Sequence, residues 1–313
     1  MVVHFLETVH PVLAERLTAA GHTCVESYGV SRAEILAGAL TEAEGLVVRS
    51  RFMVDAELLA ALPALRFIAR SGSGLENIDV AAAEARGVAV FNSPEGNRVA
   101  VAEHAMGMLL ALLHKLAVAD ASVRRGEWLR EQHRGLELAG RTVGIIGLGQ
   151  TGSAFAQRLL AFECRVLAYD KYSPLPVPGV ELVDEATLLG ASDVVSLHLP
   201  LTDETDGLVN DAWLNRLSRN PILLNTSRGP IVSTAAVARA LSAGRLSGVA
   251  LDVLEEEGRD LLALTNRSEG LTALAADPRA LLTPHVAGWT VESYVKLSNV
   301  LADKVLNQFP LTF

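Results

Sequence analysis

The chain has 313 residues, of which half are apolar, and a formal net charge of −9. This length predicts about two domains with a core that forms without disulfides or metals, and the negative charge argues against a general binder of nucleic acid or anionic membranes. No run of about 18 apolar residues occurs and no signal peptide precedes the first strand, so we expect a cytoplasmic protein without a membrane span in which Cys24 and Cys164 stay reduced.

Up to about residue 95, short apolar segments alternate with helical ones. This alternation predicts parallel strands joined by right-handed crossovers. The predicted strands are Val2–Leu6, His22–Glu26, Leu46–Val48, Arg66–Ala69 and Ala89–Phe91, and the predicted helices include Pro11–Ala20 and Asp55–Ala61. One long helix is predicted next, over Val99 to about Ala119, followed by a looser charged segment, Asp120 to Leu138.

A dinucleotide-binding fingerprint begins at residue 142. A short apolar strand, Thr142–Ile146, leads into a glycine-rich turn and a helix, and a second strand, Arg165–Tyr169, ends at an acid. The glycines allow a tight turn, close approach of the backbone to a pyrophosphate, and packing of the helix on the strand, while the helix N-terminus faces the phosphates. The predicted cofactor residues here are Gly147, Gly149, Gln150, Thr151, Gly152 and Asp170.

The acid at the end of the second strand favours one cofactor. Asp170 can accept hydrogen bonds from a ribose 2′-OH and would repel a 2′-phosphate, so we expect NAD(H) rather than NADP(H). The neighbouring Lys171 weakens this preference slightly.

After the fingerprint the alternation of strands and helices resumes. The predicted strands are Val194–Leu197, Ile222–Asn225, Gly248–Asp252 and Leu281–Thr283, the helices include Glu185–Leu189 and Ser233–Ser242, and a final helix spans about Val291 to Phe309. We therefore predict an α/β protein of two doubly wound, Rossmann-like domains with a cleft between them. The domains are residues 1–97 plus 288–313, a discontinuous flavodoxin-like substrate domain, and residues 98–287, an NAD-binding Rossmann domain.

Three polar residues follow strand ends of the second domain. Arg228, Glu257 and His285 stand where open α/β sheets bind ligands. An arginine can clamp a carboxylate, a histidine can exchange a proton near neutral pH, and a glutamate can orient the imidazole. Together they suggest reversible oxidation of an alcohol beside a carboxylate, although each alone is more often a cap or a surface pair. Asp252 has an equal claim to be a structural acid.

Several motifs together resemble the D-isomer-specific 2-hydroxyacid dehydrogenase family over nearly the whole chain. They include the glycine loop at 70–79, the Ala-Glu-His at 102–104, the fingerprint, and the segments that carry Arg228, Asp252 and His285. The resemblance implies that Arg228 binds the substrate carboxylate, that His285 is the acid/base and that Glu257 pairs with it. It also implies cofactor contacts by His198, Pro200, Thr226 and Asp252, substrate contacts by Ser71, Gly72, Ser73, Gly74 and Asn97, and a homodimer formed through residues 99–140.

Within this family the sequence is most like the phosphoglycerate dehydrogenases. Arg49 and Arg70 look like the substrate edge of those enzymes, and Arg130 lies in a segment like their intersubunit arm. A cluster of Arg49, Arg51, Arg66 and Arg70 would suit a substrate with both carboxylate and phosphate, whereas Arg51 and Arg66 can also be surface charges. Since the sequence ends at Phe313, we expect the short form without a regulatory domain.

Three questions stay open at this point. Gly258 replaces a proline common in the family and the segment 255–280 looks longer and more helical, so Glu255 and Glu256 compete with Glu257. The expected substrates are 3-phosphoglycerate and phosphohydroxypyruvate of serine biosynthesis, with glyoxylate, hydroxypyruvate or D-lactate as alternatives and formate disfavoured. A distant alternative is an NAD-responsive corepressor, which would need an exposed groove for partner peptides.

Overall fold

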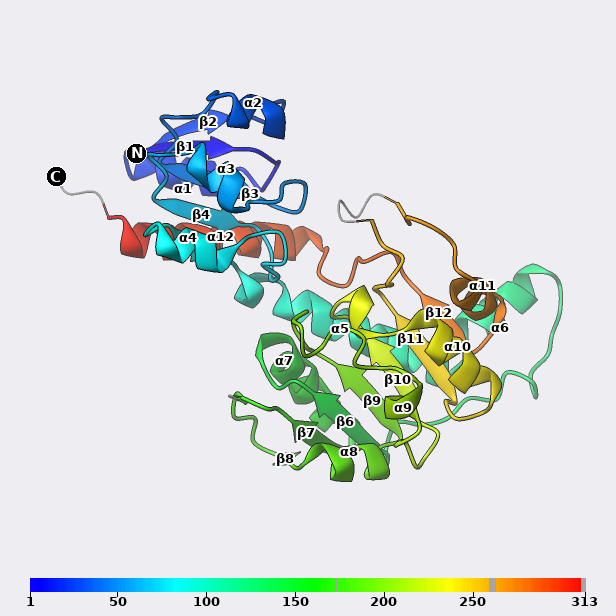
Figure 1. The fold of residues 1–313 in the computed structure, drawn as a ribbon. Helices are drawn as coiled ribbons and strands as arrows, with labels where there is room; N and C mark the ends of the chain where they lie inside the picture. The colour runs from blue at the N-terminus through cyan, green and yellow to red at the C-terminus, as the bar shows by residue number, and fades with distance from the viewer. Residues whose placement is uncertain (173, 259–262, 311–313) are drawn as a thin grey trace. The chain divides into compact units, whose positions relative to one another are not determined.

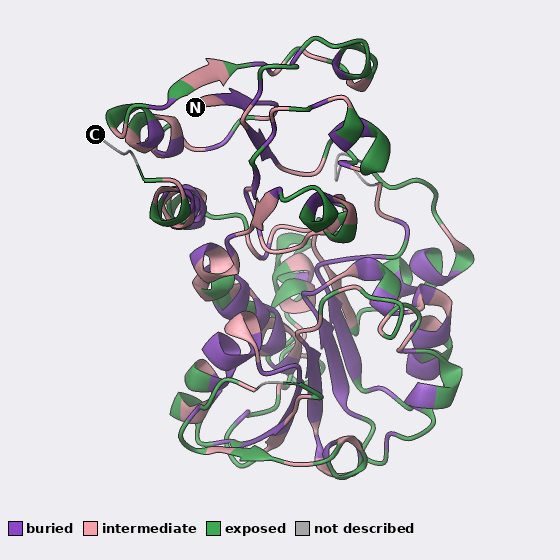
Figure 2. Cartoon of the chain, turned by 60° about the vertical axis from the view of Figure 1, so that its left-hand side comes forward, coloured by how far each residue is buried: buried purple, intermediate pink, exposed green. Residues whose placement is uncertain are grey.

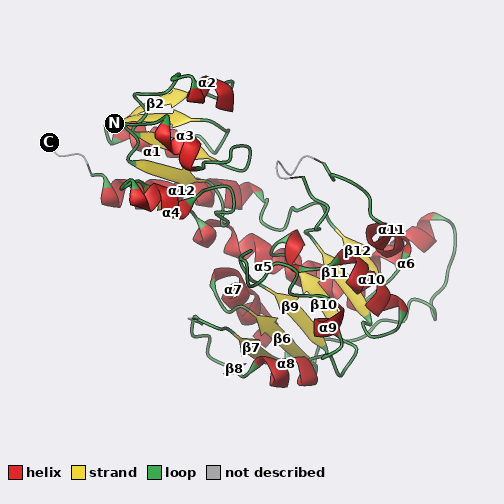
Figure 3. Ribbon diagram, viewed as in Figure 1, coloured by secondary structure: helices red, strands yellow, loops and turns green. Residues whose placement is uncertain are grey.

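The computed structural model describes residues 1–172, 174–258 and 263–310, which form two compact units. Residues 1–97 and 289–310 make up the first unit, and residues 98–258 and 263–288 make up the second. Each unit is a parallel sheet with interleaved helices (Figure 1, Figure 3), which confirms the predicted fold class.

The first unit is built on a five-stranded parallel sheet of order β2-β1-β3-β4-β5. This is the flavodoxin-like strand order. The strands are β1 (Val2–Phe5), β2 (Thr23–Glu26), β3 (Gly45–Val48), β4 (Phe67–Arg70) and β5 (Ala89–Phe91). The helices are α1 (Val12–Ala19), α2 (Arg32–Leu36), α3 (Ala56–Ala60), α4 (Val80–Ala85) and, from the far end of the chain, α12 (Val291–Gln308).

The side chains along the strands of this sheet belong alternately to two apolar clusters. Leu46, Val48 and Ile68 pack with side chains of α2, α3 and α4. Val3, Val47 and Phe67 belong instead to the cluster that contains α1 and α12. Successive residues of a strand point to opposite faces of the sheet. A single apolar strand therefore packs against the helices of both clusters.

The second unit has a seven-stranded parallel sheet of order β12-β11-β10-β9-β6-β7-β8. Counted from β6, this is the Rossmann order with one strand added at the edge. Its strands are β6 (Thr142–Ile146), β7 (Arg165–Tyr169), β8 (Val180–Leu182), β9 (Val194–Leu197), β10 (Ile222–Asn225), β11 (Gly248–Leu251) and β12 (Ala280–Leu282). Its helices are α5 (Pro94–Leu113, whose first turn belongs to the first unit), α6 (Leu116–Arg124), α7 (Gln150–Leu159), α8 (Glu185–Ala191), α9 (Asp211–Leu214), α10 (Thr234–Ser242) and α11 (Glu269–Ala276), with short 3₁₀ turns at Leu160–Phe162 and Gly229–Ile231.

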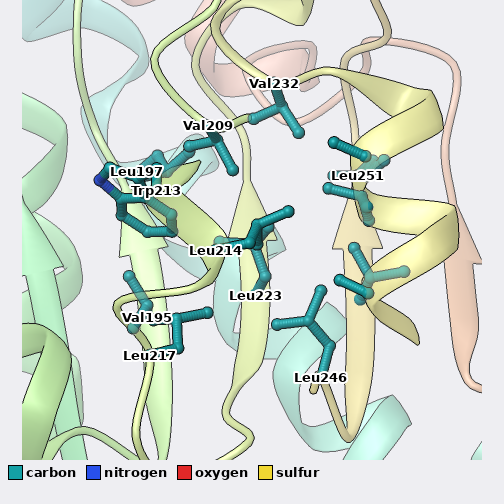
Figure 4. Close-up of a cluster of buried hydrophobic side chains, with 14 of the residues drawn as sticks. Val195, Leu197, Val209, Trp213, Leu214, Leu217, Leu223, Val232, Leu246 and Leu251 are labelled. Atoms are coloured by element: carbon teal, nitrogen blue, oxygen red, sulfur yellow. The ribbon is translucent and has the colours of Figure 1, made fainter. Parts of the chain in front are cut away.

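The buried strands of this sheet are covered on both faces (Figure 2). One cluster joins side chains of α5 and α7 to the sheet. The other joins Val195, Leu223 and Leu251 of neighbouring strands to Trp213 and Leu246 (Figure 4). These two layers hold the strand ends in place, and the strand ends carry the site described below.

The single helix predicted over Val99–Ala119 was wrong. The helical run starts earlier, at Pro94, and it breaks between α5 and α6, where Lys115 adopts a left-handed conformation with φ +53°. The break has a tertiary cause, because the segment after α6 returns to the end of α5. The backbone N–H of Leu136 donates to the carbonyl of Leu113 over 2.9 Å, and the ammonium group of Lys115 donates to the carbonyl of Gln132 over 2.9 Å.

Among the described residues, no single helix meets the length and apolarity needed to cross a membrane. Only α5 and α6 taken together do so, as a pair bent by 61°.

The segment 255–280, expected to be unusually helical, holds one regular helix, α11, among its described residues. Residues 259–262 lie outside the described part of the chain. The short elements α2, α4, β8 and α9 were not predicted, since each is three to six residues long and has too little periodicity to read.

Candidate active site

Three neighbouring strands of the second sheet carry the predicted catalytic residues. Strands β10, β11 and β12 are adjacent and parallel, so their carboxyl ends lie along one edge of the sheet. Arg228 follows β10, Glu257 lies in the segment after β11, and His285 follows β12. Ligands of doubly wound sheets bind at this edge.

His285 and Glu257 form a direct pair. The Nδ1 atom of His285 lies 2.8 Å from Oε2 of Glu257, and the other carboxylate oxygen of Glu257 accepts the backbone N–H of Leu254 over 2.5 Å. Both side chains are about one-fifth to one-quarter exposed, at 27% and 19%. A carboxylate on Nδ1 leaves Nε2 as the ring nitrogen available to a ligand.

The two other glutamates that competed for this role are occupied elsewhere. The carboxylate of Glu255 accepts the backbone N–H of Thr234 over 2.7 Å at the start of α10. Glu256 is buried and accepts hydrogen bonds from the hydroxyls of Thr234 and Ser268. Glu257 is therefore the glutamate that pairs with His285.

Asp252 holds the loop that carries His285. This buried carboxylate accepts the hydroxyl of Thr283 over 2.6 Å and the backbone N–H groups of Val286 and Ala287 over 2.9 and 2.8 Å. The Nε2 atom of His104 lies 3.5 Å from the same carboxylate and 3.1 Å from the Thr283 hydroxyl. The sequence left open whether Asp252 is a structural acid or a contact of the cofactor. These hydrogen bonds give it a structural role.

The backbone of His285 is left-handed, with φ +53°. A non-glycine residue in this region is strained, and such strain persists only where its surroundings impose it. Here the N–H of His285 donates to the carbonyl of Asp252 over 2.7 Å. Asp252 therefore holds the loop through its backbone as well as through its side chain.

Arg228 projects from a turn that is stabilised by neighbouring polar groups. Buried Asn225 donates to the carbonyl of Arg228 over 2.9 Å and accepts the N–H of Ser227 over 3.0 Å. A Cβ atom at the next residue, Gly229, would come within 1.9 Å of the carbonyl oxygen of Leu254. The turn after β10 therefore lies against the segment after β11, with Arg228 half-buried beside it.

The glycine turn has the shape that a dinucleotide needs. Gly147 has φ +92°, and a Cβ at Gly152 would stand 2.0 Å from the Gly147 carbonyl oxygen, so both positions require glycine. A Cβ at Gly149 would meet nothing within 4 Å, which leaves open space directly over the backbone. Beside it, Asp170 accepts the N–H groups of Leu148 and Tyr172 over 2.8 and 2.9 Å, which fixes the carboxylate at the end of β7.

Further residues predicted to contact the cofactor follow β9 and β10 at the same edge of the sheet. His198 lies between Ser196, whose hydroxyl is 2.9 Å from Nε2, and Phe155, whose ring centroid is 5.3 Å away. Burial lowers the pKa of His198 to about 4, so its imidazole is neutral. The buried hydroxyl of Thr226 has no hydrogen-bond partner among the described residues, as expected of a group that binds a ligand. Pro200 follows in the same loop, where its carbonyl accepts the Thr205 hydroxyl over 2.7 Å.

One residue on the cofactor side, Arg98, was not predicted from the sequence. The guanidinium of Arg98 donates to the Gln150 side chain over 2.7 Å, which places a cation beside the first residue of α7, next to Thr151. Nothing in the fingerprint points to a residue so far upstream. Together with the helix N-terminus, this cation suits a pyrophosphate.

The predicted substrate residues of the first unit lie around the loop after β4. The hydroxyl of Ser73 donates to Asn97 over 2.8 Å, and Asn92 donates to the Ser73 carbonyl over 2.6 Å. Gly72 has φ +146°, and a Cβ there would overlap the guanidinium of Arg70 at 1.6 Å. The loop Ser71–Gly74 thus wraps closely around Arg70 and reaches Asn97.

The arginines that the sequence grouped into one cluster of the first unit make different contacts. The guanidinium of Arg49 lies 4.5 Å from the centroid of the Trp289 ring, and its backbone N–H donates to Glu7 over 2.6 Å. By contrast, Arg51 donates to the carbonyls of Leu6 and Tyr28 over 2.7 and 3.0 Å, which is a structural role. Arg66 is a surface residue 3.8 Å from Glu44, and Arg130 is exposed in the segment after α6.

Comparison with known proteins identifies the class of protein that this fold and site define. Residues 106–287 match the family model of the D-isomer specific 2-hydroxyacid dehydrogenase, NAD binding domain. The chain belongs to this family, and the cofactor of its second unit is NAD(H).

The proteins that are similar to this chain carry several different enzyme names. The chain is 39% identical over 286 residues to the D-3-phosphoglycerate dehydrogenase of Archaeoglobus fulgidus, covering 89% of this chain and 52% of that protein. It is 35% identical over 275 residues to the hydroxypyruvate reductase of Thermotoga maritima, covering 86% of each. A glyoxylate reductase from Paecilomyes thermophila has a similar structure, with a TM-score of 0.87, 26% identity and coverage of 100% of this chain and 97% of that one.

The chain spans about half the length of the phosphoglycerate dehydrogenases that it matches, such as 52% of the Archaeoglobus fulgidus protein.

Proposed function

We propose that this chain is an NAD-dependent D-2-hydroxyacid dehydrogenase whose preferred substrates are 3-phosphoglycerate and phosphohydroxypyruvate. The observation that carries the proposal is the pair of His285 and Glu257 beside Arg228, on the same sheet edge as the glycine turn. The family membership of the chain and its likeness to phosphoglycerate dehydrogenases support it.

We assign the following tasks in this reaction to the predicted site residues. Arg228 binds the carboxylate of the substrate through its planar fork and polarises the adjacent oxygen. His285, protonated on both nitrogens, keeps Nδ1 on Glu257 and donates its Nε2 proton to the carbonyl oxygen during reduction; in oxidation neutral Nε2 accepts the hydroxyl proton. Ser71–Gly74 and Asn97 bind the substrate carboxylate from the first unit. When bound, NAD(H) supplies or accepts the hydride.

The preference for a phosphorylated acid rests on two arginines. The proposed phosphate ligands are Arg49 and Arg70, which resemble the substrate edge of phosphoglycerate dehydrogenases, whereas Arg51 and Arg66 are engaged elsewhere. Stacking on an indole holds a guanidinium flat and leaves its N–H edge for an anion.

A second candidate is reduction of an unphosphorylated 2-keto acid such as hydroxypyruvate or glyoxylate. The match to the hydroxypyruvate reductase of Thermotoga maritima covers 86% of both chains and favours this candidate. It requires the same Arg228, Glu257 and His285 but no phosphate ligand.

The deciding experiment is NADH oxidation with phosphohydroxypyruvate, hydroxypyruvate, glyoxylate and pyruvate side by side. We expect the highest kcat/KM with phosphohydroxypyruvate, and Arg49→Met should remove that advantage while leaving the rate with hydroxypyruvate within about threefold. Equal or better rates with unphosphorylated acids would support the second candidate. No turnover with any 2-keto acid would contradict both.

We also propose that the chain forms a homodimer through α5, α6 and the segment that follows. Four large apolar side chains of this region are exposed, namely Leu116, Val123, Trp128 and Leu136 at 56%, 54%, 83% and 53%. Monomeric proteins rarely leave such a group uncovered. Light scattering should give a dimer, and Trp128→Glu should shift it towards the monomer.

A further inference from the structure

Lys171, the residue after Asp170, is held by a carboxylate that is distant in the sequence. The ammonium group of Lys171 lies 2.7 Å from Oε2 of Glu204, which belongs to the loop after β9. The hydroxyl of Tyr172 donates to the same oxygen over 2.9 Å. The side chains of Lys171, Glu204 and Tyr172 are all exposed, at 55%, 56% and 76%.

This arrangement changes the local charge beside Asp170. Its hydrogen bond to Glu204 raises the pKa of Lys171, and the same contact lowers the pKa of Glu204, so both groups are charged at neutral pH. An isolated exposed ion pair adds little to folding stability. Its effect lies instead in the field at the end of β7, where two carboxylates outnumber one ammonium.

Without its partner Glu204, Lys171 beside Asp170 would favour the binding of a phosphate group. A 2′-phosphate carries about two negative charges, and a free Lys171 would offset part of its repulsion by Asp170. The pairing with Glu204 both occupies Lys171 and contributes a second negative charge. Tyr172, whose backbone N–H already donates to Asp170, holds Glu204 in place through its hydroxyl.

We propose that Glu204 is a cofactor-specificity residue, which excludes NADP(H) by holding Lys171 away from a 2′-phosphate and by adding negative charge beside Asp170. The proposal rests on the NAD(H) site assigned to Gly147–Gly152 and Asp170. It does not depend on which 2-hydroxy acid is the substrate.

The test is equilibrium binding of NADH and NADPH, followed by protein fluorescence without substrate. Glu204→Gln keeps the side-chain length and an acceptor for Tyr172 but removes the charge. We expect it to lower the Kd for NADPH roughly tenfold, while the Kd for NADH stays within about twofold. The gain should shrink as salt is added, since the site is exposed.

Two further variants serve as controls. Lys171→Met added to Glu204→Gln should cancel most of the gain, because the freed ammonium group is then missing. Glu181→Gln makes the same change of net charge in an equally exposed pair with Arg165, at the other end of β7, and should leave both Kd values unchanged.

The proposal is overturned if Glu204→Gln leaves NADPH binding unchanged, if Glu181→Gln produces the same gain, or if the gain persists without Lys171. A wild-type protein that binds neither nucleotide would overturn the cofactor site itself and this proposal with it. A wild-type protein that binds NADH but reduces no 2-keto acid would contradict the proposed activity alone.

Discussion

At the scale of single residues, two carboxylates hold His285 in place, one through its ring and one through its loop. Glu257 fixes the ring of His285 through Nδ1, and Asp252 fixes its backbone through four hydrogen bonds of the loop from Thr283 to Ala287. His198 has no such carboxylate partner among the described residues, and burial keeps it neutral. Two histidines at the same sheet edge therefore have different partners, a carboxylate for His285 and a hydroxyl for His198.

Replacement of His285 should remove the acid/base and little else. We expect His285→Asn to lower kcat about 10²-fold or more, because asparagine tolerates the left-handed backbone but cannot exchange the proton. The Kd for NADH should stay within about twofold, and stopped-flow or steady-state kinetics with titration of NADH measures both. Turnover close to that of the wild type would rule His285 out as the acid/base.

His198 should make the stability of the protein depend on pH. Its pKa is lowered from 6.5 to about 4 in the folded state, so the unfolded state binds more protons between these values, and stability present above pH 6.5 is lost as the pH falls towards 4. At pH 5 the loss due to this group is about 2 kcal/mol.

His198→Gln keeps an acceptor or donor for Ser196 and removes the titration. Urea unfolding at pH 7.5 and pH 5 should show a smaller fall in the free energy of unfolding for this variant than for the wild type. An equal fall in both proteins would mean that His198 is not the group responsible.

At the scale of elements, the turn between β6 and α7 combines two kinds of glycine. Gly152 is required by the fold, since its Cβ would collide with the backbone at 2.0 Å. The fold does not require glycine at position 149, since a Cβ there would stand in open space, and its predicted task is to leave room for the ligand. One turn therefore contains a position that tests stability and a position that tests binding.

The two glycines should respond differently to alanine. Gly149→Ala should unfold at nearly the wild-type temperature but bind NADH at least about tenfold more weakly, because the methyl group occupies the space over the backbone. Gly152→Ala should lose both stability and binding. Thermal unfolding and NADH titration of the two variants check this, and unchanged NADH binding by Gly149→Ala would contradict the assignment of the turn.

The broken helix is also decided at this scale. The apolar pattern over Val99–Ala119 is continuous, yet the chain turns at Lys115 because the segment 132–136 binds the end of α5. Leu136 donates to the carbonyl of Leu113, and Lys115 donates to the carbonyl of Gln132. A periodic pattern shows which face is buried but does not show where a tertiary contact interrupts it.

At the scale of the whole molecule, the first unit is completed by a helix from the far end of the chain. In α12, Leu301, Ala302 and Val305 are fully buried against α1 and the first sheet. Arg16 of α1 reinforces this packing by donating to Asp303 over 2.6 Å. The stability of residues 1–97 thus depends on a segment that the chain adds after the second unit.

A cavity in α12 should destabilise the first unit selectively. We expect Leu301→Ala to cost about 2–5 kcal/mol, the usual cost of deleting a buried leucine. Hydrogen exchange should show faster exchange in β1, β3 and α1, with the strands of the second unit as internal control. Equal loss of protection in both units would contradict two separately packed cores.

The sequence alone determined the fold class, the glycine turn with Asp170, and the residue types at the strand ends. These features are local, because parallel strands read as short apolar runs and the fingerprint needs each glycine at a set place along a single strand, turn and helix. It also named Arg228 and His285, whose flanking strands are unambiguous.

Only the tertiary structure decided which groups meet. The sequence favoured Glu257 as the partner of His285 but left Glu255 and Glu256 as competitors. The structure selects Glu257, because hydrogen bonds from Thr234 and Ser268 engage the other two. Likewise, Arg98 reaches Gln150 and Glu204 reaches Lys171 across 52 and 33 positions of the chain. Such pairs carry no local signal, because side chains distant in sequence come within hydrogen-bond distance only once the strands have taken their order in the sheet.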